Sequence, residues 1–342
     1  MSRLAYRSRV AATLLAVAVS VAGCGPRPGV SASVPIETLR VGLGFIPSVQ
    51  FAPFYLAEQR GYYANGTPHL AVTFENKIDP DLITLVGQGA LDLGVADGTS
   101  VIPAVSQGIP IRYTATIYGK FPSVVLAKAS SGIATAADLA GTKIGIPGRY
   151  GSSWVMLQAL LDSVGLAPDD VTIVDYPDFG QGIAVQQDAV DAATGFVNNE
   201  PVQLELEGIE TVVLRIDEVI ALPGPGLIAG TGTLDSKRNA IAAFIAATLR
   251  AMDEIAANPE VGLEAAIAVV PELAADRQKQ LAILEATIDT WQTSANRFGA
   301  IDRAGWEASI AYLSELGLVP NPVTVDQLVR DDLLPPAPAP SP

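Results

Sequence analysis

Between residues 39 and 197 the chain alternates short apolar runs with segments of helical spacing. The strand-like runs are Leu39–Leu43, Leu70–Phe74, Leu91–Ala96, Thr142–Ile146, Val171–Val174 and Ala192–Val197. The helix-like segments between them are Phe54–Arg60, Asp79–Gly87 and Ser153–Val164. Strands that alternate with helices predict βαβ units, and therefore mostly parallel sheets covered by helices on both faces. From Ser236 to Leu316 the pattern is helical throughout, so we expect an α/β chain that ends in helices.

The N-terminus has the pattern of a secretory signal. Three arginines precede an apolar run from Val10 to Ala22, which is too short to span a bilayer. The run ends in Val21-Ala22-Gly23-Cys24, and Cys24 is the only cysteine of the chain. This ending resembles the bacterial lipobox, in which the cysteine after the cut carries a lipid; an ordinary signal followed by a chance cysteine is the alternative. We expect residues 1–23 to be removed and Cys24 to anchor the chain on the extracytoplasmic face of the cell membrane.

Composition excludes several classes of function. Removal of a signal with three basic and no acidic residues takes the formal charge from −15 to −18, so we expect no nucleic-acid partner. A single cysteine rules out an intrachain disulfide, and the single histidine, His69, lies in a predicted turn. Without a cluster of His and Cys we expect no transition-metal site, and no motif calls for a cofactor.

Both ends of the mature chain have the composition of flexible segments. Gly25–Glu37 is rich in Pro, Gly and Ser, and it predicts a tether over residues 24–37 between the lipid and the globule. The C-terminal Pro335–Pro342 reads PPAPAPSP, which predicts a disordered tail over residues 333–342. The residues between the two ends suffice for two domains of ordinary size.

Aromatic residues are few, but they gather where strands are expected to end. One group lies between Phe45 and Tyr63 and includes Phe51 and Phe54. Others stand in predicted strand-to-helix loops: Tyr118, Phe121, Tyr150, Trp154, Tyr176, Phe179 and Phe196. In open α/β sheets these loops meet beyond the carboxyl ends of the strands, where ligands bind. Packing in the core is the alternative for each ring taken alone, whereas several rings in converging loops favour a planar ligand.

Polar residues follow the same strand ends. The loop Gly148–Trp154 carries Ser152 and Ser153 at the predicted start of a helix, where amides and hydroxyls can bind a ligand's polar group. It lacks the Gly-Lys-Ser/Thr ending of a phosphate loop, and capping by either serine is the alternative. Asp97 and Thr99 follow one strand, and Asn199 and Glu200 follow another; Glu200 could equally cap the next helix.

Several segments resemble one known family. The stretch Gly44–Ala57, the runs Val86–Val95 and Ala137–Gly145, and Asp191-Ala192-Ala193 are similar to solute-binding proteins of ABC importers. The branch is the one that takes thiamine pyrimidine precursors, nitrate, alkanesulfonates and taurine. Within it, the wording of Phe45–Ala57, Phe121-Pro122, Gly148–Ser153 and Asn199–Val202 is most like that of riboflavin-binding lipoproteins of bacterial flavin importers.

The resemblance implies a type II periplasmic-binding-protein fold, with two α/β lobes joined by two crossing strands and a ligand in the cleft. We place the crossings near Ala127–Ser131 and Ile228–Thr231, so that lobe one holds residues 38–129 plus 231–332 and lobe two holds 130–230. The implied partners are a small-molecule ligand and the membrane permease of an ABC importer. The protein itself is expected to be a monomer.

Charge guides the choice of ligand. Among the loops expected at the cleft only Lys120 and Arg149 are basic, whereas Asp97, Asp178 and Glu200 are acidic. Anions require positive charge or amide nests, so a neutral aromatic heterocycle fits better. We rank riboflavin first, a thiamine-precursor pyrimidine second, and an anion such as nitrate, a sulfonate or taurine third.

The site predicted from the sequence contains no catalytic residue. Relatives of this fold include iron-dependent, cysteine-rich pyrimidine synthases, but this chain offers only the lipidated Cys24 and His69, and no Ser/His/Asp arrangement is found. The predicted ligand-binding residues are Phe45, Gln50, Phe51, Asp97, Thr99, Tyr118, Phe121, Tyr150, Ser152, Ser153, Trp154, Phe179, Asn199 and Glu200.

Overall fold

The structure is a computed structural model that describes residues 35–77, 81–218 and 220–336. The predicted signal 1–23, the predicted lipidation site Cys24 and most of the predicted tether lie outside the described residues, as do residues 337–342 of the predicted tail. Within the part of the chain that the structure describes, no helix combines the length and the apolar character needed to cross a membrane.

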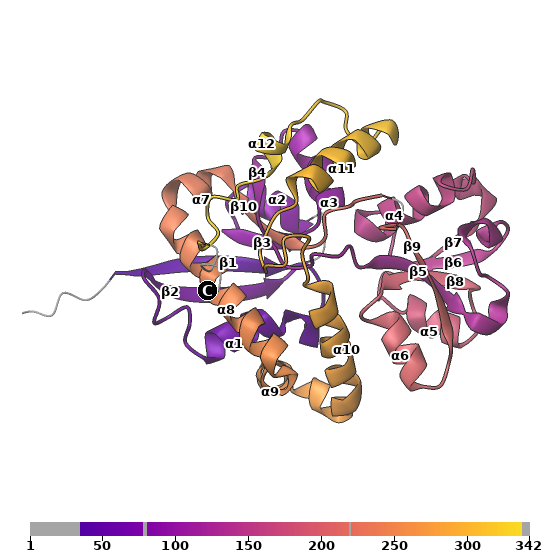
Figure 1. Ribbon diagram of the computed structural model, residues 1–342, viewed down its shortest axis with the longest axis horizontal. Helices are drawn as coiled ribbons and strands as arrows, with labels where there is room; N and C mark the ends of the chain where they lie inside the picture. Colours follow the sequence, from indigo (N-terminus) through magenta and orange to yellow (C-terminus); the bar gives the residue numbers. More distant parts are fainter. Residues whose placement is uncertain (1–34, 78–80, 219, 337–342) are drawn as a thin grey trace, which may run out of the picture. The chain divides into compact units, whose positions relative to one another are not determined.

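Two five-stranded sheets organise the chain (Figure 1). The first has the order β2-β1-β3-β10-β4, with β1 at Ile36–Leu43, β2 at His69–Asn76, β3 at Leu93–Ala96, β4 at Ile111–Thr116 and β10 at Gly226–Gly230. The second has the order β7-β6-β8-β5-β9, with β5 at Ser123–Lys128, β6 at Lys143–Ile146, β7 at Thr172–Asp175, β8 at Ala192–Phe196 and β9 at Thr211–Arg215.

Each sheet contains one strand that runs against the others. In the first sheet β10 is antiparallel to both β3 and β4, and in the second β5 is antiparallel to both β8 and β9. The pairs β1–β2 and β6–β7 are parallel. The reversed strand is in each case the first strand after the chain has come from the other sheet. The predicted α/β class with two mainly parallel sheets is confirmed.

The chain changes sheets earlier than the sequence analysis placed it. The first change falls between Thr116 and Ser123 and the second between Arg215 and Gly226. The predicted crossings near Ala127–Ser131 and Ile228–Thr231 therefore lie too far along the chain. The physical reason is that β5 and β10 are themselves fully paired strands of the sheet they enter, so that the connections precede them.

We call the first sheet with the helices packed on it the first lobe, and the second sheet with its helices the second lobe. The first lobe contains α1 (Ala52–Gln59), α2 (Asp81–Gly87), α3 (Gly98–Ser106), α7 (Thr231–Ser236), α8 (Arg238–Ala257), α9 (Pro259–Val269), α10 (Arg277–Thr290), α11 (Arg303–Glu315) and α12 (Val325–Leu328). The second contains α4 (Gly151–Asp162), α5 (Gln181–Gln186) and α6 (Glu200–Leu206). Short 3₁₀ helices are η1 (Val49–Phe51), η2 (Ala129–Ser131), η3 (Ala136–Leu139), η4 (Pro168–Asp170) and η5 (Pro271–Asp276).

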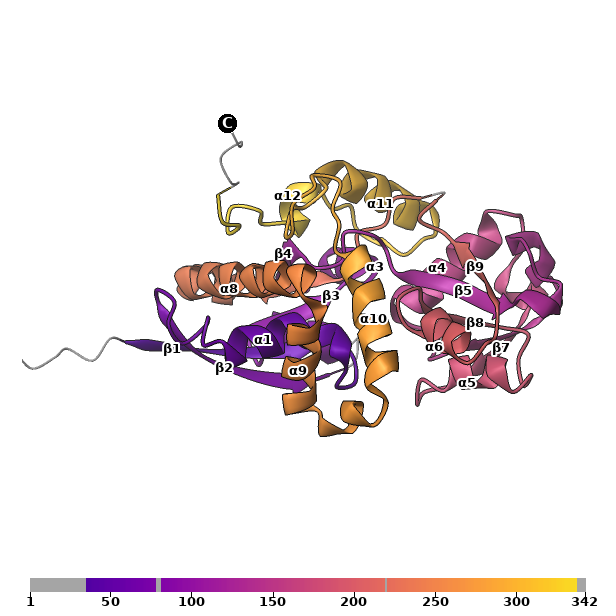
Figure 2. The same cartoon turned by 60° about the horizontal axis from the view of Figure 1, so that its bottom comes forward.

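Helices cover both faces of each sheet. In the first lobe α1, α8 and α9 lie on one face, whereas α2, α3, α11 and α12 lie on the other (Figures 1 and 2). Neighbouring residues of β10 show the alternation, since Leu227 and Ala229 join the first core cluster and Ile228 joins the second. In the second lobe α4 packs on one face and α5 with α6 on the other. Two covered faces explain why the inner strands, such as β3, β8 and β10, are nearly continuous apolar runs.

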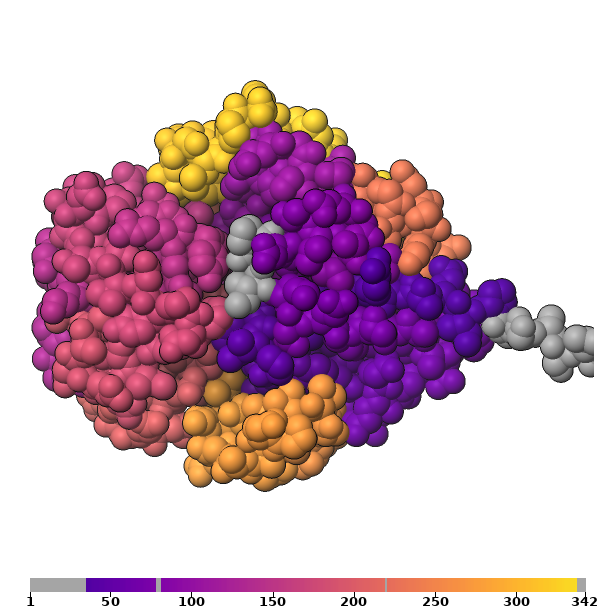
Figure 3. All heavy atoms as spheres, turned by 180° about the vertical axis from the view of Figure 1, so that it is seen from behind, coloured from indigo at the N-terminus to yellow at the C-terminus, as the bar shows by residue number. Residues whose placement is uncertain are grey.

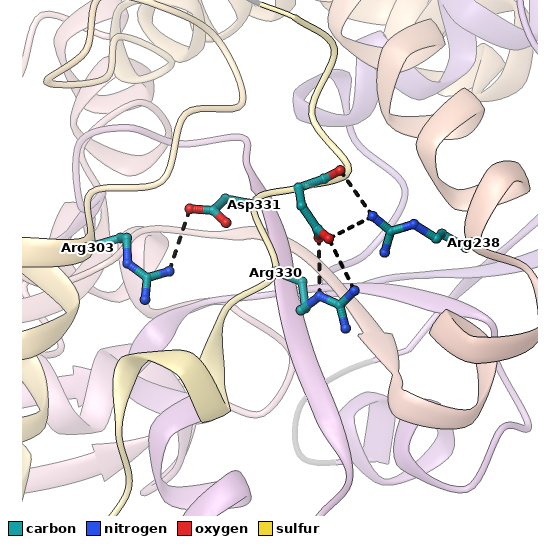
Figure 4. Close-up of polar contacts among 5 residues, drawn as sticks. Arg238, Arg303, Arg330 and Asp331 are labelled. Carbon is teal, nitrogen blue, oxygen red and sulfur yellow. Dashed lines mark hydrogen bonds and ion pairs between the residues drawn. The ribbon is translucent and has the colours of Figure 1, made fainter.

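The ends of the described chain are more ordered than predicted. Ile36 and Glu37, assigned to the tether, begin β1 and pair with β2. Leu333, assigned to the tail, is buried in the core of the first lobe. The segment before it is held by ion pairs, because Asp332 accepts from Arg238 at 2.7 Å and from Arg330 at 3.1 Å (Figure 4). These contacts and the parallel bridge between Tyr113 and Val329 fix the last part of the first lobe.

Candidate ligand-binding site

A cavity of about 140 Å³ lies where residues of the two lobes meet. It is lined by Gly44, Phe45, Gln50, Phe51, Val95, Ala96, Asp97, Tyr118, Pro147, Tyr150, Gly151, Ser152, Ser153, Phe179, Gln181, Gly195, Phe196, Asn199, Glu200 and Pro225. Most of these residues stand at or just beyond the carboxyl ends of β1, β3, β6 and β8. This is the edge at which open α/β sheets bind ligands.

The first-lobe wall is built from residues of that lobe's own core. Ser48 accepts a hydrogen bond from the Gln50 amide at 3.1 Å and so turns the chain into η1, which brings Gln50 and Phe51 to the cavity. Phe51 is only 7% exposed and its ring packs against Phe54 at 6.3 Å between centroids. Burial raises the pKa of Tyr118, whose hydroxyl donates to Gln50 Oε1 at 3.4 Å. The aromatic surface on this side is therefore held rigidly.

The second-lobe wall presents its rings from loops. Tyr150 precedes α4 and is 36% exposed, and Phe179 has a left-handed backbone with φ of 60°. Two aromatic contacts join the lobes: Phe45 meets Phe179 edge-on at 4.8 Å, and Tyr118 meets Phe196 at 6.5 Å. The rings from both lobes thus face one cavity, as a planar ligand requires.

The α4 N-terminus lies against the cavity without a side-chain cap. The N-cap residue is Tyr150, and neither serine caps the helix, contrary to the alternative considered from the sequence. Ser152 and Ser153 are half-buried and line the cavity. A helix start with open amides and two hydroxyls can bind a carbonyl or hydroxyl group of a ligand.

Asp97 is a buried carboxylate on the first-lobe side. Its Oδ1 accepts from the Ser100 amide at 3.2 Å and from the Thr99 hydroxyl, so it caps α3. Burial raises the pKa of Asp97, while hydrogen bonds from Thr99, Ser100 and the second lobe's Ser152 lower it. Asp97 therefore caps α3 and also presents a carboxyl group at the cavity.

Glu200 is a titratable group on the second-lobe side. Its Oε2 accepts from the Phe196 amide at 2.8 Å. The side chain fits only because two neighbours are glycines: a Cβ at Gly195 would lie 2.7 Å from Glu200 Oε2, and one at Gly182 would lie 3.0 Å from Glu200 Cγ. Burial raises the pKa of Glu200 to about 7, against the opposing effect of its backbone hydrogen bonds. The residue is half-buried as a whole because it faces the cavity.

Gln181 supplies an amide beside this carboxyl group. It is 1% exposed, and its Nε2 donates to Glu200 Oε1 at 3.3 Å. Its Oε1 is buried and has no hydrogen-bond partner in the described part of the chain. A buried acceptor left without a donor costs about 1–3 kcal/mol. The arrangement therefore favours a ligand that brings a hydrogen-bond donor to this wall.

Most of the predicted site residues line the cavity, and three do not. Thr99 is buried behind Asp97 and bonds to it. Phe121 is 1% exposed in the core of the second lobe. Trp154 packs against that same core, with the Arg149 guanidinium 5.6 Å from its ring centroid. The remaining predicted residues are Phe45, Gln50, Phe51, Asp97, Tyr118, Tyr150, Ser152, Ser153, Phe179, Asn199 and Glu200, and the structure brings all of them to the cavity.

Sequence reasoning missed two residues of chemical interest. Phe196 stands at the end of the predicted strand Ala192–Val197, which is a signal that could have placed it at the cavity. Gln181 stands at the first position of a short helix and carries no motif, so only the fold reveals it. The lining also includes main-chain neighbours such as Gly44 and Pro147.

The cavity is acidic. Asp97 and Glu200 are its two carboxylates, and none of the described residues that line it is Lys, Arg or His. Arg149 and Lys120, the two basic residues expected nearby, do not line it. Among the described residues no group of three or more His, Cys, Asp or Glu side chains is arranged to hold a metal ion.

Comparison with known proteins identifies the family. The family model described as NMT1/THI5 like matches residues 48–261. The chain belongs to the NMT1/THI5-like family. It is 30% identical over 315 residues to a protein of Chloroflexus aurantiacus named riboflavin-binding protein RibY, a match that covers 90% of this chain and 89% of the relative.

The chain is also similar to a synthase and, in structure, to a sulphonate-binding protein. The chain is 31% identical over 173 residues to the 4-amino-5-hydroxymethyl-2-methylpyrimidine phosphate synthase of Legionella pneumophila, which covers 50% of this chain and 52% of the relative. In structure it is similar to the periplasmic aliphatic sulphonate binding protein SsuA of Escherichia coli, with a TM-score of 0.69 and 19% identity over 86% of this chain and 97% of that one. The fold is the two-lobed fold of periplasmic binding proteins. Family, fold and cavity together make the chain a solute-binding protein of this family.

Proposed function

We propose that this NMT1/THI5-like protein binds riboflavin outside the cytoplasmic membrane and delivers it to the permease of an ABC importer. The observation that carries the proposal is the cavity between the lobes, which combines aromatic rings from both sides with two carboxylates and no basic residue among the described lining. A flat ring system gains apolar burial and about 0.5–1.5 kcal/mol for each aromatic pair. The similarity to the Chloroflexus riboflavin-binding protein supports the same ligand.

The acidic lining argues against an anionic ligand. A nitrate or sulfonate group only accepts hydrogen bonds. The amides at the α4 N-terminus can donate to it, but it would also face Asp97 and Glu200, and no described lining residue is positively charged. The buried Gln181 Oε1 also has no hydrogen-bond donor among the described residues, and an anion would not supply one. A flavin supplies donors through its ring N–H and its hydroxyl groups.

A thiamine-precursor pyrimidine is the second candidate. The volume of about 140 Å³ favours it, since that space alone suits a single ring better than a tricyclic one. Either ligand is bound without chemical conversion, because a carrier must release what it took up. Incubation should therefore return the ligand unchanged.

A panel of titrations tests the proposal. Isothermal titration calorimetry of the purified protein against riboflavin, the hydroxymethylpyrimidine, taurine and nitrate should give saturable binding of one riboflavin per chain and no saturable heat with taurine or nitrate. Tight binding of the pyrimidine with none of riboflavin would favour the second candidate. Binding of nitrate would contradict the argument from charge, and binding of taurine with none of riboflavin would contradict the proposed ligand.

Lipid anchoring is a separate part of the proposal. In a bacterial host the full-length protein should partition into the membrane fraction, whereas Cys24→Ala should be released to the aqueous fraction, because a lipid on Cys24 is the anchor that the sequence predicts. Quantitative immunoblots of the two fractions measure this. Equal partitioning of the two proteins would contradict a lipid anchor on Cys24 and would not affect the proposal of ligand binding.

A further inference from the structure

A second cavity, of about 270 Å³, adjoins the first. The two share Phe45, Phe179, Asn199 and Glu200 among their lining residues. The second cavity continues along the loop Phe45–Ser48 and between α5 and α6 of one lobe and α10 of the other. We call it the side groove. From behind, the surfaces of the two lobes border one another where the pink and the indigo-to-purple segments meet (Figure 3).

The size of the first cavity makes the side groove relevant to the ligand. Sites for ligands of drug size usually have volumes of about 300–1,000 Å³. The first cavity, at about 140 Å³, is below this range. A tricyclic ring with a five-carbon chain would therefore extend beyond it, and the side groove is the adjoining space that shares four of its lining residues.

The walls of the side groove suit hydroxyl groups. Ser48, Gln186, Asn199, Gln203 and Gln280 bring hydroxyl and carboxamide groups that both donate and accept hydrogen bonds. Some already form a network: Gln203 donates to Asn199 Oδ1 at 2.9 Å, and Gln186 donates to Glu207. Such groups match a polyol chain, whose hydroxyls are also both donors and acceptors.

The charge of the side groove opposes a phosphate. Asp178, Glu200 and Glu207 line it, and Lys279 is the one basic residue among its described lining. Lys279 Nζ is moreover 3.6 Å from Asp276, so its charge is partly balanced. A dianionic phosphate at the end of the chain would meet an excess of carboxylates.

We propose that the side groove is the subsite for an uncharged polyhydroxy chain of the ligand, which leaves the ring cavity past the contact between Phe45 and Phe179. This rests on the proposed function, because it requires a ligand with a flat ring and a hydroxylated chain. The side groove then selects riboflavin over the same ring without the chain and over the same chain with a terminal phosphate.

Three flavins and two variants test the subsite. The wild-type protein should bind lumiflavin, which lacks the polyol chain, and flavin mononucleotide, which carries a phosphate, each at least about tenfold more weakly than riboflavin. Gln203→Ala should weaken riboflavin about threefold to tenfold and leave lumiflavin unchanged. The matched control is Gln278→Ala, because Gln278 is exposed on α10 and does not line the groove. Thermal melts of both variants confirm that they fold.

Each other outcome is decisive. Equal affinity for riboflavin and lumiflavin, or an equal loss for both in Gln203→Ala, would overturn the subsite while leaving flavin binding in place. Tight binding of flavin mononucleotide would overturn the argument from charge. If no flavin binds and the pyrimidine does, riboflavin is not the ligand, and the proposed subsite for its polyol chain is then contradicted as well.

Discussion

The two walls of the cavity differ in how they hold their side chains. On the first-lobe side Phe51 and Tyr118 are 7% and 6% exposed and belong to that lobe's core. On the second-lobe side Tyr150 is 36% exposed, and Gln181 donates a hydrogen bond to Glu200 in the same cavity lining. The first wall is therefore part of the folding core, whereas the second carries groups whose arrangement a ligand can complete. Stability and selectivity are thus divided between the two walls, and variants of the two walls should behave differently.

The largest effect is expected on the first wall. Phe51→Ala should lower the free energy of unfolding by about 3–5 kcal/mol, because it removes a buried ring from the core, and it should also weaken riboflavin binding. Chemical denaturation of the ligand-free protein measures the first effect and calorimetric titration the second. Loss of binding with unchanged stability would mean that the first wall is no more structural than the second.

On the second wall Tyr150→Ala should weaken riboflavin by about tenfold or more, since a stacked ring is lost, and should leave the melting temperature of the ligand-free protein nearly unchanged. Trp154→Ala is the matched control on the same helix start. Trp154 packs on the core instead of lining the cavity, so its replacement by alanine should destabilise the protein. If the two variants behave alike, the placement of these rings relative to the cavity is incorrect.

A smaller effect is expected from the amide on the second wall. Gln181→Leu removes the unpartnered acceptor and also the donor to Glu200 Oε1. These two effects on the stability of the ligand-free protein oppose each other, so its net change should be small, while riboflavin binding weakens. Melting curves and titrations of the same preparation give both quantities. A marked loss of stability without a change in affinity would show that Gln181 serves the fold alone.

A further prediction concerns pH. Because burial raises the pKa of Glu200 to about 7 in the folded protein, the folded state holds this proton more tightly than the unfolded state does. Its contribution to stability is present at low pH and is lost as the pH rises toward 7. Asp97 also has a raised pKa, so the wild type must be compared with Glu200→Gln. The wild type should lose stability relative to this variant between about pH 4.5 and 7; parallel curves would contradict the raised pKa.

The fold class could be predicted from the sequence, whereas the positions at which the chain crosses from one sheet to the other could not. Apolar runs marked β1, β2, β3, β6, β7 and β8, and the inner strands among them are buried on both faces and need continuous apolar residues. The strands β4, β5, β9 and β10 were not recognised as sheet strands, because their antiparallel pairing depends on partners far along the chain. The position at which a chain leaves one sheet for the other is set by that long-range pairing and leaves little local mark.

The sequence predicts which loops meet at the site, because the carboxyl ends of parallel strands converge at one edge of a sheet. Loop residues such as Tyr150, Phe179 and Glu200 could be placed at one edge from the order of the elements. The direction of a side chain could not, and for this reason Phe121 and Trp154 were expected at the cavity but lie in the core of the second lobe. Gln181 illustrates the opposite case, since its role depends on Glu200, which is distant in sequence but adjacent in the fold.

We propose that rings of both lobes enclose one flat, uncharged ligand. The most direct measurement is a fluorescence titration of riboflavin with the wild-type protein and with Tyr150→Ala, because stacking on aromatic rings quenches flavin emission. We expect emission to fall and to saturate at one flavin per chain with the wild type, and the fall to be much weaker with the variant at the same concentrations. Unchanged emission at protein concentrations at which another ligand of the panel saturates the protein would contradict the claim.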